Sequence, residues 1–171
     1  LYINPKNGYK LTEFLNDARN CDPGCYSDVR ACMKKLRQFH EMGLEVSHEF
    51  DLFGQIEYYE SLWDGMPSEY KDYKKTKENV LSLRSVIEAY KAPKSLTHID
   101  AVPDNFLFVN EQGQREIRLI DWEYSGMQDP HVDIAMFCIY SMYGKQQIDK
   151  TIRAYFTKGC SEEIYTKIYC Y

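Results

Sequence analysis

The segment LTHIDAVPDNFLFVN, residues 96–110, constrains this chain more than any other stretch of its sequence. It places His98, Asp100 and Asp104 in a short segment that is otherwise mostly apolar, directly before Asn105. Polar side chains in such a segment either cap turns and satisfy one another or form a site. The residues that follow help to decide between these two interpretations.

A β-hairpin is predicted immediately after this polar cluster. Residues 105–109 and 116–120 are short β-prone runs, and a polar segment with a glycine separates them. In an antiparallel pair the start of the first strand lies beside the end of the second, so we expect Asn105 and Asp121 to be close in space. An amide oxygen and a carboxylate, with Asp100 nearby, suit a hard cation such as Mg²⁺ that keeps some waters and binds substrate phosphates.

The spacing of these residues gives an independent signal. Protein kinases place the catalytic aspartate and a magnesium-binding asparagine as H-R-D-x-x-x-x-N, and a second metal-binding aspartate follows a hairpin. Here His98, Asp100 and Asn105 have the same spacing, and Asp121 stands in the place of the later aspartate. The pattern therefore favours phosphoryl transfer. The alternative is that Asp100 and Asp104 cap turns and that His98 is a hydrogen-bonded core histidine.

Length and composition predict a single folded domain. The chain has 171 residues, of which 44% are hydrophobic and 27% charged, which is typical of globular proteins and not of fibrous or disordered ones. The net charge of −5, without a long basic block, gives no reason to expect a nucleic-acid partner. No apolar run approaches the ~18 residues of a membrane span, so no membrane insertion is expected. The six cysteines lack zinc-ligand spacing, so we expect reduced thiols and a cytoplasmic protein.

Much of the chain between residues 27 and 90 has helical periodicity. A first helix is expected from a cap at Ser27 to a stop at Gly43, a second over residues 49–63, and a long third helix after Pro67. The apolar positions expected to be buried are Val29, Met33, Leu36 and Phe39 in the first helix, Phe50, Phe53, Ile56, Tyr59 and Leu62 in the second, and Tyr70, Tyr73, Val80, Leu83, Ile87 and Tyr90 in the third.

Two longer segments resemble a known kinase family. The chain resembles the catalytic half of the choline kinase family, bacterial type, within the broader aminoglycoside-phosphotransferase-like kinases. The resemblance lies in LTHIDAVPDNFLF and IRLIDWEYSGMQDPHVDIAMF and, more weakly, in LRQFH at residues 36–40. The resemblance implies an α+β, predominantly helical fold. It would be the C-terminal lobe of a protein-kinase-like fold with a small catalytic β-hairpin.

The resemblance also divides the chain. Residues 1–15 are expected to be the end of an N-terminal lobe and the hinge, and residues 16–171 the C-terminal catalytic lobe. Residues 1–3 and 9–11 predict a short hairpin around an Asn-Gly turn with no sheet to join. The family's Gly-rich phosphate loop and strand lysine are not found, so we expect the N-terminal lobe to be largely absent and this chain alone to be inactive. In the hinge, the nucleotide-binding residues implied are Thr12, Glu13, Phe14 and Leu15.

Individual roles follow from the same resemblance. Asp100 resembles the catalytic base that accepts or orients the substrate hydroxyl, and Asn105 and Asp121 resemble the magnesium ligands. Asp133 resembles a buried aspartate that accepts hydrogen bonds from the catalytic-loop backbone, and His98 is expected to anchor that loop. These groups would align the hydroxyl with the γ-phosphate of ATP and neutralise charge through Mg²⁺.

The substrate prediction depends on aromatic residues. A quaternary ammonium binds aromatic faces through cation–π attraction, and Tyr124, beside Glu123, stands where the family places a substrate-binding residue. Phe137, Tyr140 and Tyr143 are equally consistent with core packing. We therefore expect ATP- and Mg²⁺-dependent phosphorylation of choline to phosphocholine. The alternatives are a kinase of the same fold acting on ethanolamine, an aminoglycoside or another small amine or alcohol, and a non-catalytic kinase-like binding fragment.

Overall fold

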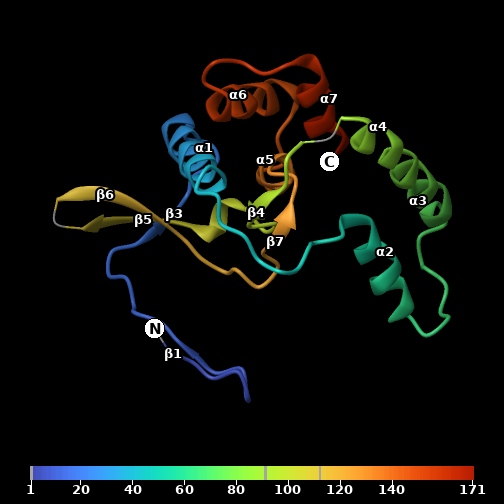
Figure 1. Cartoon of the computed structure of the whole chain (residues 1–171), viewed down its shortest axis with the longest axis horizontal. Helices are drawn as coiled ribbons and strands as arrows, with labels where there is room; N and C mark the ends of the chain where they lie inside the picture. The colour runs from blue at the N-terminus through green and yellow to red at the C-terminus, as the bar shows by residue number, and fades with distance from the viewer. Residues whose placement is uncertain (1, 91, 112) are drawn as a thin grey trace.

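The computed structural model describes residues 2–90, 92–111 and 113–171, and it combines a helical body with small antiparallel sheets (Figure 1). The helices are α1 (Tyr26–His40), α2 (Leu52–Ser61), α3 (Tyr73–Ser82), α4 (Arg84–Ala89), η1, a 3-10 turn (Pro103–Asn105), α5 (His131–Tyr140), α6 (Lys145–Tyr155) and α7 (Glu162–Cys170). The strands are β1 (Tyr2–Ile3), β2 (Lys10–Leu11), β3 (Arg19–Asn20), β4 (Ser95–Thr97), β5 (Phe106–Glu111), β6 (Gln114–Leu119) and β7 (Gly126–Gln128).

The hairpin predicted after the polar cluster is confirmed. β5 and β6 pair antiparallel with Phe106 opposite Leu119 and Glu111 opposite Gln114, so both strands extend further toward the turn than predicted. β3 pairs with the other edge of β5, and β4 pairs with β7 in a separate sheet. The end of β6 is thereby held beside the start of β5, where the candidate site lies.

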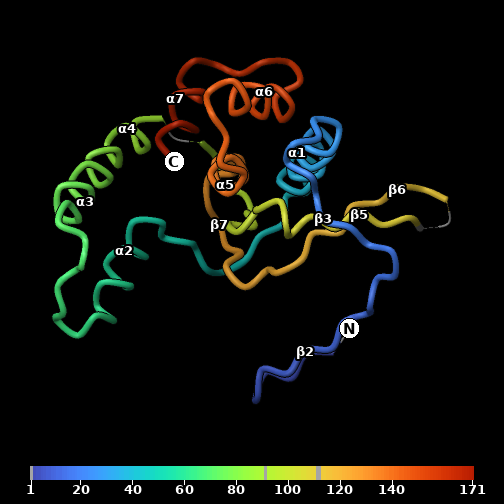
Figure 2. The backbone as a smooth tube through the Cα atoms, turned by 180° about the vertical axis from the view of Figure 1, so that it is seen from behind, coloured from blue at the N-terminus to red at the C-terminus, as the bar shows by residue number. Residues whose placement is uncertain are grey.

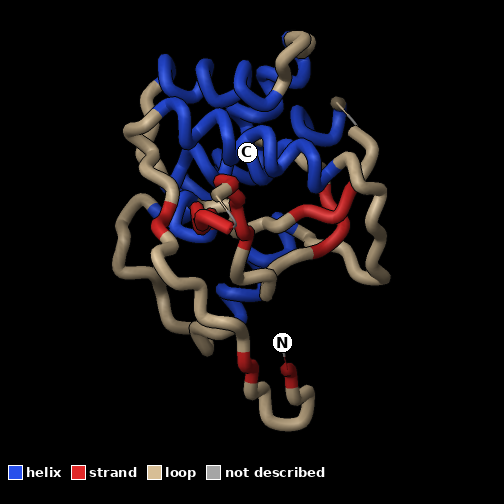
Figure 3. The backbone as a smooth tube through the Cα atoms, turned by 90° about the vertical axis from the view of Figure 1, so that its left-hand side faces the viewer, coloured by secondary structure: helices blue, strands red, loops and turns tan. Residues whose placement is uncertain are grey.

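The N-terminal hairpin is also present, with Tyr2 opposite Leu11 and Ile3 opposite Lys10. Leu1, which was included in this prediction, lies outside the described residues. Figures 2 and 3 show the hairpin extending away from the helical body. Its apolar side chains are largely solvent-exposed, with Tyr9 and Leu11 71% and 67% accessible.

α1 supplies one wall of the core, and its predicted apolar stripe is confirmed. Val29, Met33 and Leu36, at spacings of four and three residues, are buried. The predicted boundaries were wrong. Cys25 and not Ser27 is the N-cap, and the helix ends at His40; the left-handed residue Gly43, with φ of 65°, lies in the loop beyond it.

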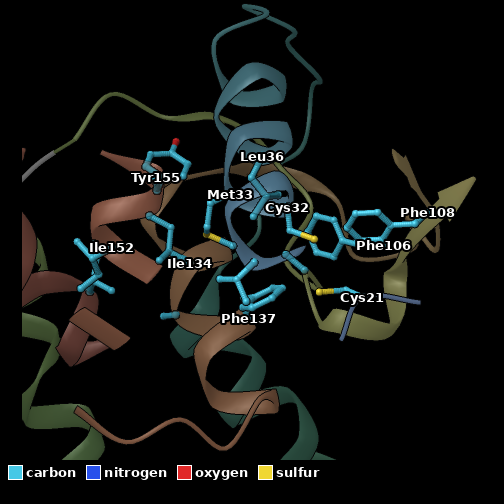
Figure 4. Packing of buried hydrophobic residues seen from close by; sticks show 14 residues of the cluster. Cys21, Cys32, Met33, Leu36, Phe106, Phe108, Ile134, Phe137, Ile152 and Tyr155 are labelled. Carbon is cyan, nitrogen blue, oxygen red and sulfur yellow. The ribbon is translucent and has the colours of Figure 1, made fainter. Parts of the chain in front are cut away.

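The core joins α1 to α5, α6 and the hairpin. Figure 4 shows Met33 of α1 packed among Ile134 and Phe137 of α5, with Phe106 of β5 alongside. The rings of Phe106 and Phe137 meet edge to face with centroids 5.7 Å apart, and both are fully buried. Truncating a buried phenylalanine to alanine costs about 3–5 kcal/mol, so this contact fixes the position of the hairpin on the helices.

The segment from α2 to α4 differs from the prediction. No residue of α2 or α3 is buried, and the expected single long helix starts only at Tyr73 and breaks at Leu83. Tyr70, predicted to be buried, is 77% exposed, and Ile87 is the buried member of the third stripe. The cause is that α2 and α3 contact each other and do not cover the main core: the Tyr73 hydroxyl of α3 donates to the Glu60 carboxylate of α2 at 2.8 Å, and the ring of Trp63, just after α2, lies 5.1 Å from that of Tyr73.

A buried ionic cluster ties α7 to the start of α5. The Asp129 carboxylate accepts hydrogen bonds from the Lys167 ammonium and from the Tyr171 hydroxyl, the latter at 3.0 Å, and His131 Nδ1 lies 2.8 Å from it. Burial raises the pKa of Asp129, but the His131 ring and the Lys167 ammonium outweigh this effect and hold that pKa well below its usual value. The carboxylate is therefore charged in the folded protein near neutral pH.

The six cysteines are free thiols, as predicted. Among the described residues, no helix combines the length and the apolar character that crossing a bilayer requires.

Candidate active site

The loop after β4 carries the first candidate residue, Asp100, and a buried carboxylate holds its backbone. Asp133, at the start of α5 and fully buried, accepts hydrogen bonds from the backbone N–H groups of His98 and Ile99 at 2.9 and 2.7 Å. Ile99 adopts φ of 70°, a left-handed conformation that is costly for a β-branched residue, by about 1–3 kcal/mol. The charge-assisted hydrogen bonds from the His98 and Ile99 N–H groups offset that cost and fix the direction in which the backbone enters Asp100.

Asp133 is itself positioned by α1 and α6. His40 Nε2 lies 2.9 Å from Asp133 Oδ2, and its Nδ1 lies 2.7 Å from the Tyr155 hydroxyl. All three side chains are buried. The sequence analysis noted the segment that contains His40 but assigned no role to His40 or Tyr155. His40 lies 93 positions from Asp133 and 115 positions from Tyr155, so it meets them only through the tertiary fold.

Asn105 is brought directly against Asp100. Its side-chain nitrogen donates to the Asp100 backbone oxygen at 2.8 Å and to Asp100 Oδ2 at 3.0 Å. Since the amide nitrogen is engaged in this way, the amide oxygen is the atom that is left to bind a cation. Asn105 is 8% exposed, whereas Asp100 is half-buried and accessible to a substrate.

Asp121 follows the second strand of the hairpin and lies at the same edge as Asn105, as the predicted register required. The backbone N–H of Ile120 donates to the Asn105 backbone oxygen at 3.0 Å, so Asp121 follows immediately after a residue bonded to Asn105. Asp121 is exposed and has φ of 64°, a conformation that aspartate tolerates better than most residues. Two oxygen-bearing side chains therefore flank one edge of the hairpin.

His98 connects the two loops of the site. Its Nε2 donates to the Ile120 backbone oxygen at 2.8 Å, which requires a proton on Nε2, and its ring contacts Trp122 with centroids 4.6 Å apart. Trp122 in turn donates from its indole nitrogen to the Leu119 backbone oxygen at 2.9 Å. These contacts hold the segment before and after Asp121 against the segment before Asp100.

Glu123 and Tyr124 follow Trp122 on the same loop. In the structure, Tyr59 of α2 lies beside Tyr124. The pKa of the Tyr124 hydroxyl is raised, mainly by the adjacent Tyr59 hydroxyl, then by the Glu123 carboxylate and to a smaller extent by Asp100. Tyr59 was predicted to be part of a buried stripe, but it is 49% exposed. Helical spacing alone could not show that this face of α2 turns toward the site.

The other predicted residues lie elsewhere. Thr12, Glu13 and Phe14 are exposed, and Leu15 half-buried, in the segment between β2 and β3, which Figures 1 and 2 show away from the β4 loop. Phe137 is part of the core, and the Tyr143 hydroxyl donates to the Pro23 backbone oxygen. Tyr140, the last residue of α5, is 61% exposed.

The donor set at the hairpin edge suits a hard divalent cation, since it offers the amide oxygen of Asn105 and the carboxylates of Asp121 and Asp100. Within the described residues, no cluster of three or more histidine, cysteine, aspartate or glutamate side chains is placed to hold a metal.

Comparison with known proteins gives a consistent result. A family model described as choline/ethanolamine kinase matches residues 13–164. Protein LicA of Haemophilus influenzae is 25% identical over 160 residues, which cover 90% of this chain and 57% of that protein. This chain therefore spans a little over half the length of that relative.

Solved structures show the same fold. LicA in complex with AMP superposes with a TM-score of 0.82 at 28% identity, over 99% of this chain and 58% of that one. Choline kinase LicA from Streptococcus pneumoniae gives 0.83 at 28% identity, over 99% and 59%. A spectinomycin phosphotransferase bound to ADP and spectinomycin, at 16% identity, TM-score 0.56 and coverage of 90% and 54%, shares the fold alone. The fold is kinase-like.

Proposed function

The chain belongs to the choline/ethanolamine kinase family, and on this premise we propose that its complete form transfers the γ-phosphoryl group of ATP to the hydroxyl of choline, giving phosphocholine. The observation that carries the proposal is the Asp133 clamp, because it fixes the His98–Ile99 backbone so that Asp100 lies against Asn105. A carboxylate held in this way has the geometry of a group that orients a hydroxyl for in-line attack.

Each residue has a role that its surroundings support. Asp100 accepts the proton of the substrate hydroxyl or orients that hydroxyl, since its Oδ2 is anchored by Asn105 while the side chain stays accessible. Asn105 and Asp121 would hold Mg²⁺ through oxygen atoms. When bound, the ion neutralises the charge that develops on the transferred phosphate. His98 and Asp133 position these groups without touching the substrate.

The division into lobes is part of the proposal. Residues 1–15 would be the end of the N-terminal lobe and the hinge, with Thr12, Glu13, Phe14 and Leu15 meeting the nucleotide, and residues 16–171 the C-terminal catalytic lobe. The solvent-exposed apolar side chains of the β1–β2 hairpin support this, because exposed apolar surface of that kind is typical of a contact surface. The chain spans 57% of LicA from Haemophilus influenzae, in line with one lobe of a two-lobed enzyme. If the N-terminal lobe covers the ATP phosphates, residues 1–171 assayed alone should transfer no phosphate.

Choline is the proposed substrate because two tyrosines, Tyr124 and Tyr59, lie beside each other, close enough to Asp100 for its charge to contribute to the raised pKa of Tyr124. Tyr124 and Tyr59 offer rings that a trimethylammonium group binds through cation–π contacts. Glu123, in the same group, favours a primary ammonium, which needs hydrogen-bond acceptors. This observation makes ethanolamine the second candidate.

The proposal is tested by assaying the complete enzyme with ATP, Mg²⁺ and a panel of acceptors: choline, ethanolamine and an aminoglycoside. We expect kcat/KM for choline to exceed that for the other acceptors. A preference for ethanolamine or for the aminoglycoside would transfer the assignment to that acceptor, and no transfer to any of them would support a non-catalytic binding role.

A further inference from the structure

A cavity of about 330 Å³ lies between α5, α6 and α7, on a different face of α5 from the one that carries Asp133. Figures 1 and 2 show α6 and α7 next to the end of α5. One stripe of α5 lines the cavity at helical spacing, and Ile148 of α6 and Ile168 of α7 complete its apolar walls. The members of that stripe are Ala135, Cys138 and Ile139, and Met142 lines the cavity from the turn after α5.

The polar atoms of the walls are engaged elsewhere. Three tyrosines line the cavity, and their hydroxyls donate to groups that do not: Tyr143 to the Pro23 backbone oxygen, Tyr169 to Asp149 at 2.6 Å, and Tyr171 to Asp129 at 3.0 Å. Burial raises the pKa of the Cys138 thiol to about 12, so this wall residue is uncharged near neutral pH. A bound water needs two to four polar partners, and these walls are poorly suited to supply them. The cavity therefore favours an apolar guest.

The cavity is accessible from solvent, and a cation lies beside one of its wall residues. Met142 and Ile139 are 89% and 51% exposed, so an apolar lip leads from solvent to the interior. Lys145, 77% exposed at the N-terminal end of α6, places its ammonium 5.2 Å from the ring centroid of Tyr169, a wall residue. Its ion pair with Asp149 is long, at 3.7 Å, and Asp149 already accepts the Tyr169 hydroxyl. Lys145 is thus available to an incoming anion.

We propose that this cavity binds a medium-chain carboxylate, with the hydrocarbon chain between α5, α6 and α7 and the carboxylate beside Lys145. An apolar cavity of about 150 Å³ holds a benzene molecule, so one of this size suits a chain of about ten carbon atoms. The positive end of the α6 dipole adds to the attraction of Lys145, while Asp149 opposes it. The proposal does not depend on the kinase assignment.

The test is calorimetric titration of the protein with decanoate. We expect saturable binding that weakens about tenfold when the chain is shortened by two carbon atoms. Lys145→Ala should weaken binding several-fold, because the Lys145 ammonium lies over the ring of the wall residue Tyr169. Lys150→Ala, which changes another exposed lysine of the same helix, should not weaken it. Neither surface change threatens the fold. Decyltrimethylammonium, which has the same chain and the opposite charge, should bind more weakly than decanoate.

Two further measurements locate the ligand. Ala135→Leu fills the cavity and should abolish binding, and Ala154→Leu, on α6 but not in the cavity wall, should preserve it. The proposal is overturned by the absence of saturable binding, by binding that survives Ala135→Leu, or by equal binding of the cationic analogue.

Discussion

Replacing Asp133 by asparagine is the perturbation that the structure defines most closely. The carboxylate accepts from two backbone donors, His98 N–H and Ile99 N–H, and contacts the His40 ring, all in the interior. Asparagine has nearly the same shape, but one of its two terminal atoms becomes an NH₂ donor. In either orientation of the amide, this NH₂ group faces a backbone N–H, so at least one buried donor loses its acceptor.

The magnitude follows from these contacts. A buried donor without a partner costs about 1–3 kcal/mol, and the hydrogen bonds that remain lose their charge assistance, from about 1.5–3 to about 1 kcal/mol each. The free energy of unfolding should therefore fall by about 2–5 kcal/mol for Asp133→Asn. Ile99 would no longer be held at φ of 70°, and a displacement of Asp100 by about 1 Å would lower kcat about 100-fold.

Urea unfolding of this chain and steady-state kinetics of the complete enzyme measure the two effects. Tyr155→Phe removes only the hydroxyl bonded to His40 and should cost about 1 kcal/mol, with a small effect on kcat. Asp104→Asn, an exposed aspartate in the same segment, is the matched control and should change neither quantity appreciably. If Asp133→Asn behaved like this control, the clamp would not determine the position of Asp100.

Three further predictions follow from the site and the core. Asn105→Ala or Asp121→Ala should raise the Mg²⁺ concentration needed for half-maximal activity, because each removes an oxygen ligand; an unchanged Mg²⁺ titration would exclude these residues as ligands. Tyr124→Ala should raise KM for choline, leave KM for ATP nearly unchanged and narrow the preference over ethanolamine; an unaltered ratio in steady-state assays would remove Tyr124 from the substrate site. The depressed pKa of Asp129 contributes stability that is fully present above its unfolded value of 3.8 and is lost as the pH falls through the lower folded value. Asp129→Asn should thus flatten the loss of stability below about pH 4 in urea unfolding; an unchanged acid profile would contradict this assignment.

The sequence predicted those parts of the site that depend on local spacing. The distance from Asp100 to Asn105 is fixed within one loop, and two alternating β-prone runs around a turn fix the register that brings Asp121 back to Asn105. The burial of the α1 stripe was also predictable, because its four apolar positions have helical spacing and the helix packs directly on the core. Short-range periodicity was sufficient in these cases.

Other features depend on contacts that periodicity does not encode. The pattern that suggested one long helix through Leu83 is split there, and its apolar face remains mostly exposed because α3 packs on α2 and not on the core. Ile99, which is β-branched, is a poor candidate for a left-handed conformation until the Asp133 carboxylate is in place. Tyr59 reaches Tyr124 only because α2 is folded back toward the loop after β6. Each of these needed the tertiary structure.

The measurement that tests the central claim most directly is phosphocholine formation by the complete enzyme and its Asp100→Asn variant, followed by ³¹P NMR with ATP, Mg²⁺ and choline. Asparagine preserves the shape of the side chain but removes the charge that orients the hydroxyl, so we expect transfer to fall at least 100-fold while ATP binding, measured separately by calorimetry, changes little. Turnover within tenfold of the unmodified enzyme would contradict the assignment of Asp100 and, with it, the proposed mechanism.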